Sequence, residues 1–418
     1  MKRVATVLGT AVAAASTVNG YRPLFGRRVG SVFAWLFGLV VSELPLQTIA
    51  VQAVTLAVAS RGFSPRQRKF AWLLTAVSWT GLLGLHRIGR DANVSLTAAL
   101  DAGLGADRRS ASADIWRAAP PSGATAKTPG LLRMLRIYRH YAHDCDVSYG
   151  EHGAKNLLDI WRRPDLDPAG HAPVLLQVPG GAWASGNKRG QAHPLMSHLA
   201  ELGWVCVSIN YRLSPRATWP DHIIDVKRAI AWVKTHIAEY GGDPDFVAIT
   251  GGSAGGHLSS LAALTAGDPA FQPGFEDVDT RLQAAIPFYG VYDFTREDDD
   301  ALNPGMLPFL EKLVMKMTRG DHPESFASAS SITHVNSDAP PFFVLHGSND
   351  SFIPVTQARS FVTRLREASA QPVAYAELPC TQHAFDIFGS ARAAHAAVAV
   401  EQFLAEIYTR RELRQNTA

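Results

Sequence analysis

A serine between glycines is the residue of this sequence with the clearest capacity for chemistry. The motif Gly251-x-Ser253-x-Gly255 follows a short strand-like run, FVAIT, and precedes an apolar run with helical spacing, LSSLAALTA. In such a strand-to-helix turn the flanking positions are too tight for side chains, and the hydroxyl is exposed beside the N-terminus of the helix. The motif alone also occurs in structural turns, but this context predicts that Ser253 is a nucleophile.

A nucleophilic serine needs a general base, and the base needs an acid that orients it. Asp350 comes just after the apolar run PPFFVL, and His383 follows the next such run, VAYAELP. The loops after neighbouring parallel strands gather at one edge of a sheet, so we predict a triad of Ser253, His383 and Asp350. Four alternatives are disfavoured by position: Asp338 precedes its strand, Asp386 follows the histidine, His346 is expected to support Asp350, and His257 to brace packing on the helix after Ser253.

Backbone amides are expected to stabilise the negative charge that develops on the ester oxygen. One should come from Ala254, directly after the nucleophile, and others from Gly181 and Ala182 in the loop PGGAW after the run PVLLQV. A glycine turn without a role is the alternative. The complete set predicts an ester hydrolysis that needs no metal and no cofactor, and the acidic stretch 297–300 has no interleaved histidines that would indicate a metal site.

Short apolar runs alternate with amphipathic stretches from about Leu131 onwards, and this alternation predicts the scaffold. It indicates an α/β fold with a mainly parallel sheet that is covered by helices on both faces. The expected strands are 146–149, 156–163, 173–178, 204–210, 246–250, 284–289, 341–345 and 373–378, and the expected helices include 221–240, 354–369 and 390–408.

Two long connections within 131–418 are predicted to be cap insertions, at 267–283 and 298–336, because long connections in compact domains are usually functional. Within the second, Met306–Met317 is amphipathic and is predicted to cover Ser253. Its apolar side chains would form an adaptable acyl pocket, although a surface helix buried on one face is the alternative. The predicted pocket residues are Leu307, Phe309, Leu310 and Met315.

The first ninety residues differ from the rest in charge and hydropathy. They hold eleven Lys or Arg and one acid, Glu43, for a charge of +10, whereas the rest holds 29 basic and 36 acidic residues, for −7. Two nearly uninterrupted apolar runs, 31–59 and 70–85, are separated by a basic connection. We therefore predict that 1–90 associates with the cell membrane and is dispensable for the chemistry.

Other interpretations of this N-terminal region remain open. The two runs could span the membrane as a hairpin, lie in its interface or pack on the catalytic domain, and Glu43 and Pro45 weaken the signal for a span. The first sixteen residues also resemble a weakly hydrophobic signal peptide. Residues 91–130, rich in Ala, Gly, Ser and Pro, are predicted to be a linker.

The composition limits the class of protein. The 418 residues are 47% hydrophobic and 18% charged, which is typical of a globular chain with a large core and excludes disorder. Three scattered cysteines do not make a disulfide framework or a zinc site. The net charge of +3 argues against a nucleic-acid partner. A small-molecule or lipid ester is the expected partner, and the oligomeric state is not predicted.

Together these motifs resemble the α/β-hydrolase superfamily, and within it the hormone-sensitive-lipase-like carboxylesterases of the mycobacterial type. The resemblance covers about residues 131–410 and includes the segments GGSAGGHL, YRLSP, FYGVYDF, HGSND and QHAF. It implies a carboxylic ester hydrolase with Ser253 as nucleophile, His383 as general base and acid, and Asp350 as the orienting acid.

One position departs from the family pattern. Pro179 stands where the family's HGGG or HGGA loop has histidine, which puts the geometry of the loop in doubt. A similar loop without histidine occurs in membrane-bound isoprenylcysteine methylesterases, so a methylesterase is the second interpretation and an acyltransferase the third. A catalytically silent ligand-binding role, as in the plant gibberellin receptors that resemble this family, is disfavoured because the triad is complete.

Overall fold

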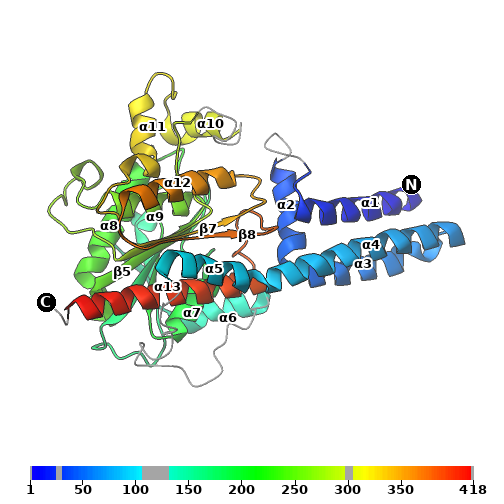
Figure 1. The fold of residues 1–418 in the computed structure, drawn as a ribbon, viewed down its shortest axis with the longest axis horizontal. Coiled ribbons are helices and arrows are strands. Elements are labelled where there is room, and N and C mark those ends of the chain that lie inside the picture. Colours follow the sequence, from blue (N-terminus) through cyan, green and yellow to red (C-terminus); the bar gives the residue numbers. More distant parts are fainter. Residues whose placement is uncertain (1, 25–30, 106–130, 297–304, 416–418) are drawn as a thin grey trace.

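The computed structural model describes residues 2–24, 31–105, 131–296 and 305–415. Its centre is an eight-stranded sheet in the order β1-β2-β4-β3-β5-β6-β7-β8, in which β1 pairs antiparallel with β2, β2 antiparallel with β4, and every other pair is parallel (Figure 1). Strands β3, β4, β6 and β7 are buried along their whole length, which explains their unbroken apolar sequences. The strands are β1 Ala142–Ser148, β2 Leu157–Trp161, β3 Ala172–Val178, β4 Val205–Ile209, β5 Gly242–Gly252, β6 Ala284–Phe288, β7 Phe342–Gly347 and β8 Val373–Leu378.

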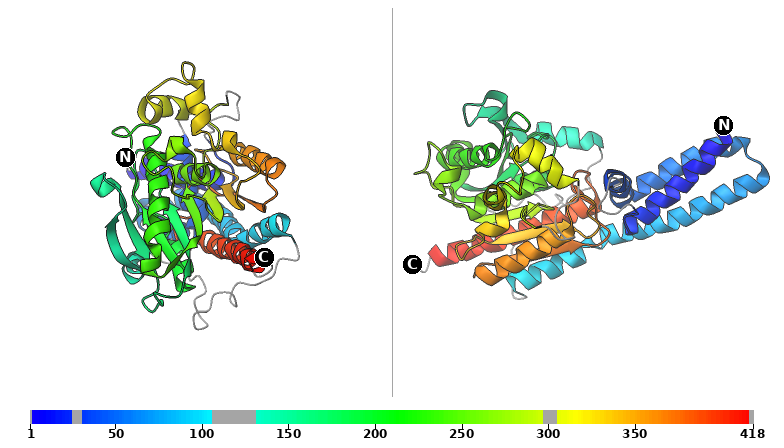
Figure 2. Two further views of the ribbon diagram at one scale, coloured as in Figure 1. Left: turned by 90° about the vertical axis from the view of Figure 1, so that its left-hand side faces the viewer. Right: turned by 90° about the horizontal axis from the view of Figure 1, so that it is seen from above.

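Helices cover both faces of this sheet, as the alternating sequence predicts (Figures 1 and 2). One face packs against α8 (Asp221–His236, continued by a short turn to Tyr240), α9 (Ala254–Leu264) and α12 (Val355–Ala368). The other packs against α7 (His193–Glu201), α13 (Ala391–Gln415) and α5 (Ala92–Leu104). Helix α6, Leu131–Tyr141, precedes β1 and packs near α7. The predicted fold class is therefore confirmed.

The N-terminal region adds four further helices: α1 (Lys2–Tyr21), α2 (Ser31–Glu43), α3 (Pro45–Ala59) and α4 (Pro65–Arg90). Helices α1, α3 and α4, which we call the N-terminal rod, lie side by side and extend away from the sheet (Figure 2). Helix α2 lies across the base of the rod, between it and the body formed by residues 131–415 (Figure 1).

The apolar run 31–59 is two helices rather than one. Pro45 begins α3 directly after Leu44, and α2 and α3 meet at an angle of 99°. Among the described residues, that bent pair is the one candidate that length and hydropathy would allow to cross a membrane, and no unbroken helix meets both conditions. A hairpin of two unbroken spans, one of the interpretations left open above, is therefore not supported by the described helices.

The predicted linker 91–130 is wrong over its first part. Residues 92–104 form α5, whose Leu96 and Leu100 are buried in the core against β8 and α13. The composition is misleading because small residues let this helix approach the sheet closely: a Cβ atom on Gly103 would lie 2.5 Å from the Cα atom of Ala374. Residues 106–130 lie outside the described part of the chain.

The first predicted cap insertion, 267–283, is also wrong as a cap. Its short helical turn, Pro269–Phe271, lies beside α8, and none of the residues of the insertion lines the cavity described below. Buried Lys227 of α8 holds both ends of the loop, by donating hydrogen bonds to the Thr265 carbonyl and to the Thr280 hydroxyl. The loop is thus part of the scaffold.

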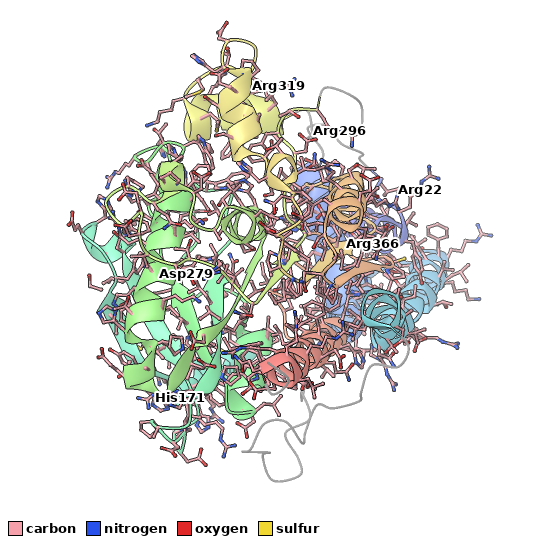
Figure 3. All side chains as sticks on the ribbon, turned by 60° about the vertical axis from the view of Figure 1, so that its left-hand side comes forward. Arg22, His171, Asp279, Arg296, Arg319 and Arg366 are labelled. Atoms are coloured by element: carbon pink, nitrogen blue, oxygen red, sulfur yellow. The ribbon has the colours of Figure 1, made fainter. Side chains whose placement is uncertain are left out.

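The second predicted insertion does approach the site. Residues 306–315 are helical, as α10 (Met306–Phe309) followed by a π-helical turn (Leu310–Met315), and α11 (Pro323–Ala329) follows. Leu310 and Met315 pack into the core instead of the predicted acyl pocket. The outer part is fastened to the body where Arg319 donates a 2.7 Å hydrogen bond to the carbonyl of Arg296 (Figure 3).

Candidate active site

Ser253 occupies a strained turn between β5 and α9. Its φ of 58° is in the left-handed region, which non-glycine residues rarely adopt outside functional sites, and its amide donates a 3.0 Å hydrogen bond to the Phe288 carbonyl of β6. The flanking glycines are sterically required: a Cβ on Gly255 would lie 2.1 Å from the Val178 oxygen, and one on Gly251 2.5 Å from the Gly255 backbone. The sequence can therefore form this turn only with glycine at both positions.

His383 and Asp350 form a buried pair at the ends of β8 and β7. The Nδ1 atom of His383 lies 2.7 Å from Oδ2 of Asp350. The other carboxylate oxygen accepts 2.8 Å hydrogen bonds from the amides of Phe352 and Ile353. Burial raises the pKa of Asp350, but the neighbouring His383 and His346 outweigh it, so that the pKa falls below its ordinary value. A charged acceptor at Nδ1 leaves Nε2 free to accept a proton.

Ser253 and His383 line one cavity of about 1060 Å³ at the carboxyl edge of the sheet. Asp350 lies behind His383, on the side away from the cavity. The three predicted triad residues are therefore brought together. The described lining also includes Gly180, Gly181, Ala182, Ser185, Gln191, Gly252, Tyr289, Gly305, Met306, Phe309, Phe352, Ile353, Ala384 and Ile387, together with Ser31, Val32 and Trp35 of α2.

The loop after β3 turns sharply beside Ser253. Gly181 has a φ of 131° and Ala182 one of 53°, so both are left-handed, and a Cβ on Gly180 would lie 2.3 Å from the Gly252 carbonyl oxygen. Among the described residues no backbone acceptor takes the Gly181 or Ala182 amide, and Ala254 is the first residue of α9, where amides lack helical partners. All three predicted donors therefore lie next to the nucleophile.

Gln191 fixes this loop despite Pro179 standing in place of the family histidine. Its side-chain amide bonds both polar groups of Gly180: the Gly180 amide donates to Oε1 at 2.8 Å, and Nε2 donates to the Gly180 carbonyl at 3.1 Å. The Tyr211 hydroxyl donates a 2.9 Å hydrogen bond to the Pro179 carbonyl. These hydrogen bonds fix the backbone of the loop at Pro179 and Gly180, so the loop has a defined geometry without the family histidine.

The alternative histidines are committed to other contacts. The indole of Trp183 donates to Nδ1 of His257 at 3.1 Å, and Nε2 of His257 lies 2.6 Å from the Ala329 carbonyl. Burial lowers the pKa of His257 to about 4, so this ring is neutral and links the loop after β3 to the cap. His346 has Nε2 3.0 Å from the Ile353 carbonyl and 3.3 Å from Asp350. Both rings have the supporting positions that the sequence suggests.

Neither alternative acid is hydrogen-bonded to His383 among the described contacts, and Asp350 holds the Nδ1 atom of that ring. Asp338 is exposed. Asp386 accepts a hydrogen bond from the hydroxyl of Tyr289, and burial raises the pKa of this carboxyl. Among the described residues, no group of three or more His, Cys, Asp or Glu is arranged to hold a metal ion.

Two contributors to the site are missed by sequence reasoning. Tyr289, at the end of β6, lines the cavity, and its ring centroid lies 4.7 Å from that of His383. Its place after a buried strand was the available signal. Trp35 of α2 donates a 2.8 Å hydrogen bond from Nε1 to the His383 carbonyl, and its ring lies 5.1 Å from that of Phe352. Nothing in an apolar run marks such a residue.

Helix α2 therefore lines the candidate active site, which argues against the prediction that residues 1–90 are dispensable for the chemistry. Gly38 allows close contact, because a Cβ there would lie 2.9 Å from Nε2 of Gln382. At the C-terminal end of α2, buried Glu43 pairs with Arg392 and accepts a 2.7 Å hydrogen bond from Ser390. The sequence could not reveal these contacts, because an apolar run does not show whether lipid or protein covers it.

Comparison with known proteins identifies the family of this chain. The BD-FAE family model matches residues 158–365. The probable carboxylic ester hydrolase LipM of Mycobacterium tuberculosis is 65% identical over 98% of this chain and 94% of its own. Esterase LipQ of the same organism is 49% identical over 90% of this chain and 85% of its own.

Solved structures share the fold. A truncated carbohydrate esterase from gut microbiota superposes with a TM-score of 0.54 at 24% identity, over 66% of this chain and 99% of its own. Esterase 2 of Thermogutta terrifontis phosphonylated by sarin superposes with a TM-score of 0.53 at 25% identity, over 63% of this chain and 91% of its own. The chain belongs to the mycobacterial carboxylic ester hydrolases, a hormone-sensitive-lipase-like group of the α/β-hydrolases.

Proposed function

We propose that this enzyme hydrolyses esters through an acyl-enzyme formed on Ser253. The Ser253 hydroxyl attacks the ester carbonyl while Nε2 of His383 accepts its proton, and the imidazolium then protonates the departing alkoxide. Water attacks the acyl-enzyme with His383 again as base, which releases the acid and frees the serine. The observation that carries the proposal is the 2.7 Å contact between His383 and Asp350 in the wall of the cavity that Ser253 lines.

The amides of Gly181, Ala182 and Ala254 are the proposed donors to the tetrahedral oxyanion. They lie beside Ser253 on two rigid supports, the loop held by Gln191 and the first turn of α9. Fixed donors of this kind stabilise charge in the transition state without reorganising, and removing one typically costs about 10²–10³ in kcat.

A fluorophosphonate probe tests the nucleophile directly. We expect the wild type to be labelled once and Ser253→Ala to lose both the label and the hydrolysis of p-nitrophenyl butyrate, by about 10⁴-fold or more. Ser259→Ala is the matched control on the same helix, because its hydroxyl donates to the Gly256 carbonyl of that helix and does not line the cavity. Phosphonylation of the Thermogutta esterase is the precedent for such labelling. Labelling of Ser253→Ala would refute the assignment.

Two neighbouring activities are outcomes of the substrate assay. Isoprenylcysteine methylesterases are relatives at lower identity, such as the probable rice enzyme, 30% identical over 58% of each chain. Faster turnover of a prenylcysteine methyl ester than of p-nitrophenyl esters from C2 to C16 would favour that activity. Transfer of the acyl group to added alcohol in preference to water would indicate an acyltransferase.

We further propose that the N-terminal rod holds the enzyme on a membrane. Large apolar side chains are exposed along it, and basic residues lie at its far turn. Exposed apolar surface of this extent is unfavourable in water, and each basic residue near anionic lipid gains about 1 kcal/mol. The exposed apolar residues of α3 and α4 include Leu46, Val51, Val54, Val58, Phe70, Trp72, Leu73, Val77 and Leu83, and the basic ones are Arg61, Arg66, Arg68 and Lys69.

Flotation of the full chain with vesicles tests this attachment. We expect it to rise with vesicles that contain phosphatidylglycerol and to rise less as salt increases, because salt screens the basic turn. Full-length protein that stays unbound to such vesicles would overturn the membrane proposal and leave the triad untouched.

A further inference from the structure

The cavity opens beside α2, on the side of the body from which the rod extends. Ser31, Val32 and Trp35 form the α2 wall of the cavity, while Met306 and Phe309 line it from the cap. Val32 lines the cavity and is nevertheless 50% exposed. A side chain with both properties lies where the cavity meets the surface, so Val32 lies at the mouth, as do Ser185 and Gly305, which also line the cavity and are exposed.

The exposed face of α2 continues from the mouth as apolar surface. Phe33, Leu36 and Phe37 are all large and exposed, and with Val32 they follow the spacing of one helical face. Charged residues are absent from α2 before Glu43, at its buried end. Polar esters in water would gain nothing from such a surface, whereas an acyl chain would be stabilised along its length.

The bend between α2 and α3 sets the orientation of this face. The exposed apolar sides of the rod and its basic turn can lie together in the head-group region, and α2, which crosses the base of the rod at 99° to α3, then has its own exposed apolar face at that depth (Figures 1 and 2). An apolar helix face at that depth contacts the boundary between head groups and acyl chains. The mouth at Val32 would then open at the same boundary.

We propose that the enzyme takes up its substrate along α2 directly from the bilayer, and that the substrate is a long-chain ester dissolved in lipid. This inference rests on the proposed membrane attachment and triad. The cavity volume of about 1060 Å³ is at the upper end for ligand sites and can hold a long acyl chain. The chain slides from lipid past Val32 between α2 and α10, and the ester group stops at Ser253.

Blocking the mouth tests the route of uptake. Val32→Trp adds bulk at a half-exposed position and keeps the surface apolar. Val51→Trp makes the same change on α3, where Val51 is 67% exposed and does not line the cavity. Each protein is assayed on a p-nitrophenyl palmitate analogue dissolved in phosphatidylglycerol vesicles and on p-nitrophenyl butyrate in water, with flotation measured in parallel.

We expect Val32→Trp to lower the ratio of palmitate to butyrate turnover at least tenfold, with flotation retained, and Val51→Trp to change that ratio less than twofold. An unchanged ratio in Val32→Trp, in a protein that still floats and folds, overturns the route. If Val32→Trp is unstable in thermal unfolding, Val32→Asp replaces it, with Val51→Asp as its control and turnover divided by the bound fraction. If the wild type does not float with vesicles, the membrane attachment is wrong. If the wild type does not hydrolyse butyrate, the triad is wrong. Failure of the uptake route is therefore distinguishable from failure of either proposal on which it rests.

Discussion

Asp350 is held more firmly than any exposed carboxylate could be. Its side chain is fully buried and is contacted by two backbone amides and two histidines. Since its pKa is lowered, it remains charged throughout the range in which His383 would act as a base. The same contacts therefore keep the Asp350 carboxylate charged and fix its orientation toward His383.

Asp350→Asn should reduce kcat by about 10²–10⁴-fold, because the amide cannot stabilise an imidazolium, and His383→Ala should cost at least as much. Near-wild-type turnover in Asp350→Asn, with Asp386→Asn inactive, would contradict the assignment.

The pH dependence of folding stability gives a second test of Asp350. A lowered folded pKa contributes stability that is present above the unfolded value of about 3.9 and lost as pH falls through the folded value. The difference in melting temperature between wild type and Asp350→Asn should therefore narrow below about pH 4.

Trp35 is a positioning residue, acting through the carbonyl of His383. Trp35→Phe keeps an aromatic ring against Phe352 but removes the donor, so we expect kcat on butyrate to fall about 2–10-fold, the range of one hydrogen bond. A displaced imidazole should also shift the acid limb of the pH–rate profile. Trp72→Phe, on exposed α4, is the control. A rise in KM alone, without change in kcat or in the pH profile, would show that Trp35 only lines the cavity and does not position His383.

The clustering of Ser253, Asp350 and His383 was predictable from sequence whereas the contact of Trp35 was not, for a physical reason. Ser253, Asp350 and His383 each follow an apolar strand, and parallel strands bring their carboxyl ends together whatever else the chain does. Trp35 reaches His383 across 348 positions of sequence, through a helix docking that no local pattern encodes. Tyr289 is an intermediate case, because its place after a buried strand was a signal, whereas its contact with His383 depends on the neighbouring loops.

At the scale of elements, the docking of α2 depends on a buried ion pair. Glu43 and Arg392 are almost completely inaccessible. The Ser42 hydroxyl donates to Oε1 of Glu43, the oxygen that pairs with Arg392, and the Ser390 hydroxyl donates to Oε2. A buried pair of this kind contributes little net stability when intact, but either charge left alone is costly.

Glu43→Gln should therefore destabilise the protein by about 3–5 kcal/mol, and Arg392→Met by a similar amount. The double variant should recover part of that loss, since no unpaired charge remains. Chemical denaturation of the four proteins measures the coupling. Additive losses in the double variant would show that the two side chains do not act as a pair.

The element-level errors of the sequence analysis share one cause. The composition of α5 is that of a linker, and the composition of α2 is that of a membrane span, yet each is covered by protein on at least one side. The composition of a segment shows only which surroundings, such as water, lipid or protein, are compatible with its side chains. Which surface covers it is decided by tertiary contacts such as Gly103 on Ala374 and Gly38 on Gln382.

At the scale of the whole molecule, the body is incomplete without the N-terminal helices. A chain beginning at Leu131 lacks α5, which fills the core beside β8, and α2, which walls the cavity. We expect this truncated chain to aggregate in size-exclusion chromatography and to lose hydrolysis even of butyrate. If the chain from residue 131 onwards is monodisperse and active, this prediction is wrong and the N-terminal helices act only as a separable anchor.

The contact between Trp35 and His383 has a consequence for proteolytic shedding. A protease that cut between α4 and α5 would free the body from the rod, but it would also separate Trp35 and Glu43 from their partners. The released fragment would carry the nucleophile without the helix that orients its base. Detachment and silencing are then one event, so the activity is confined to wherever the N-terminal helices reside.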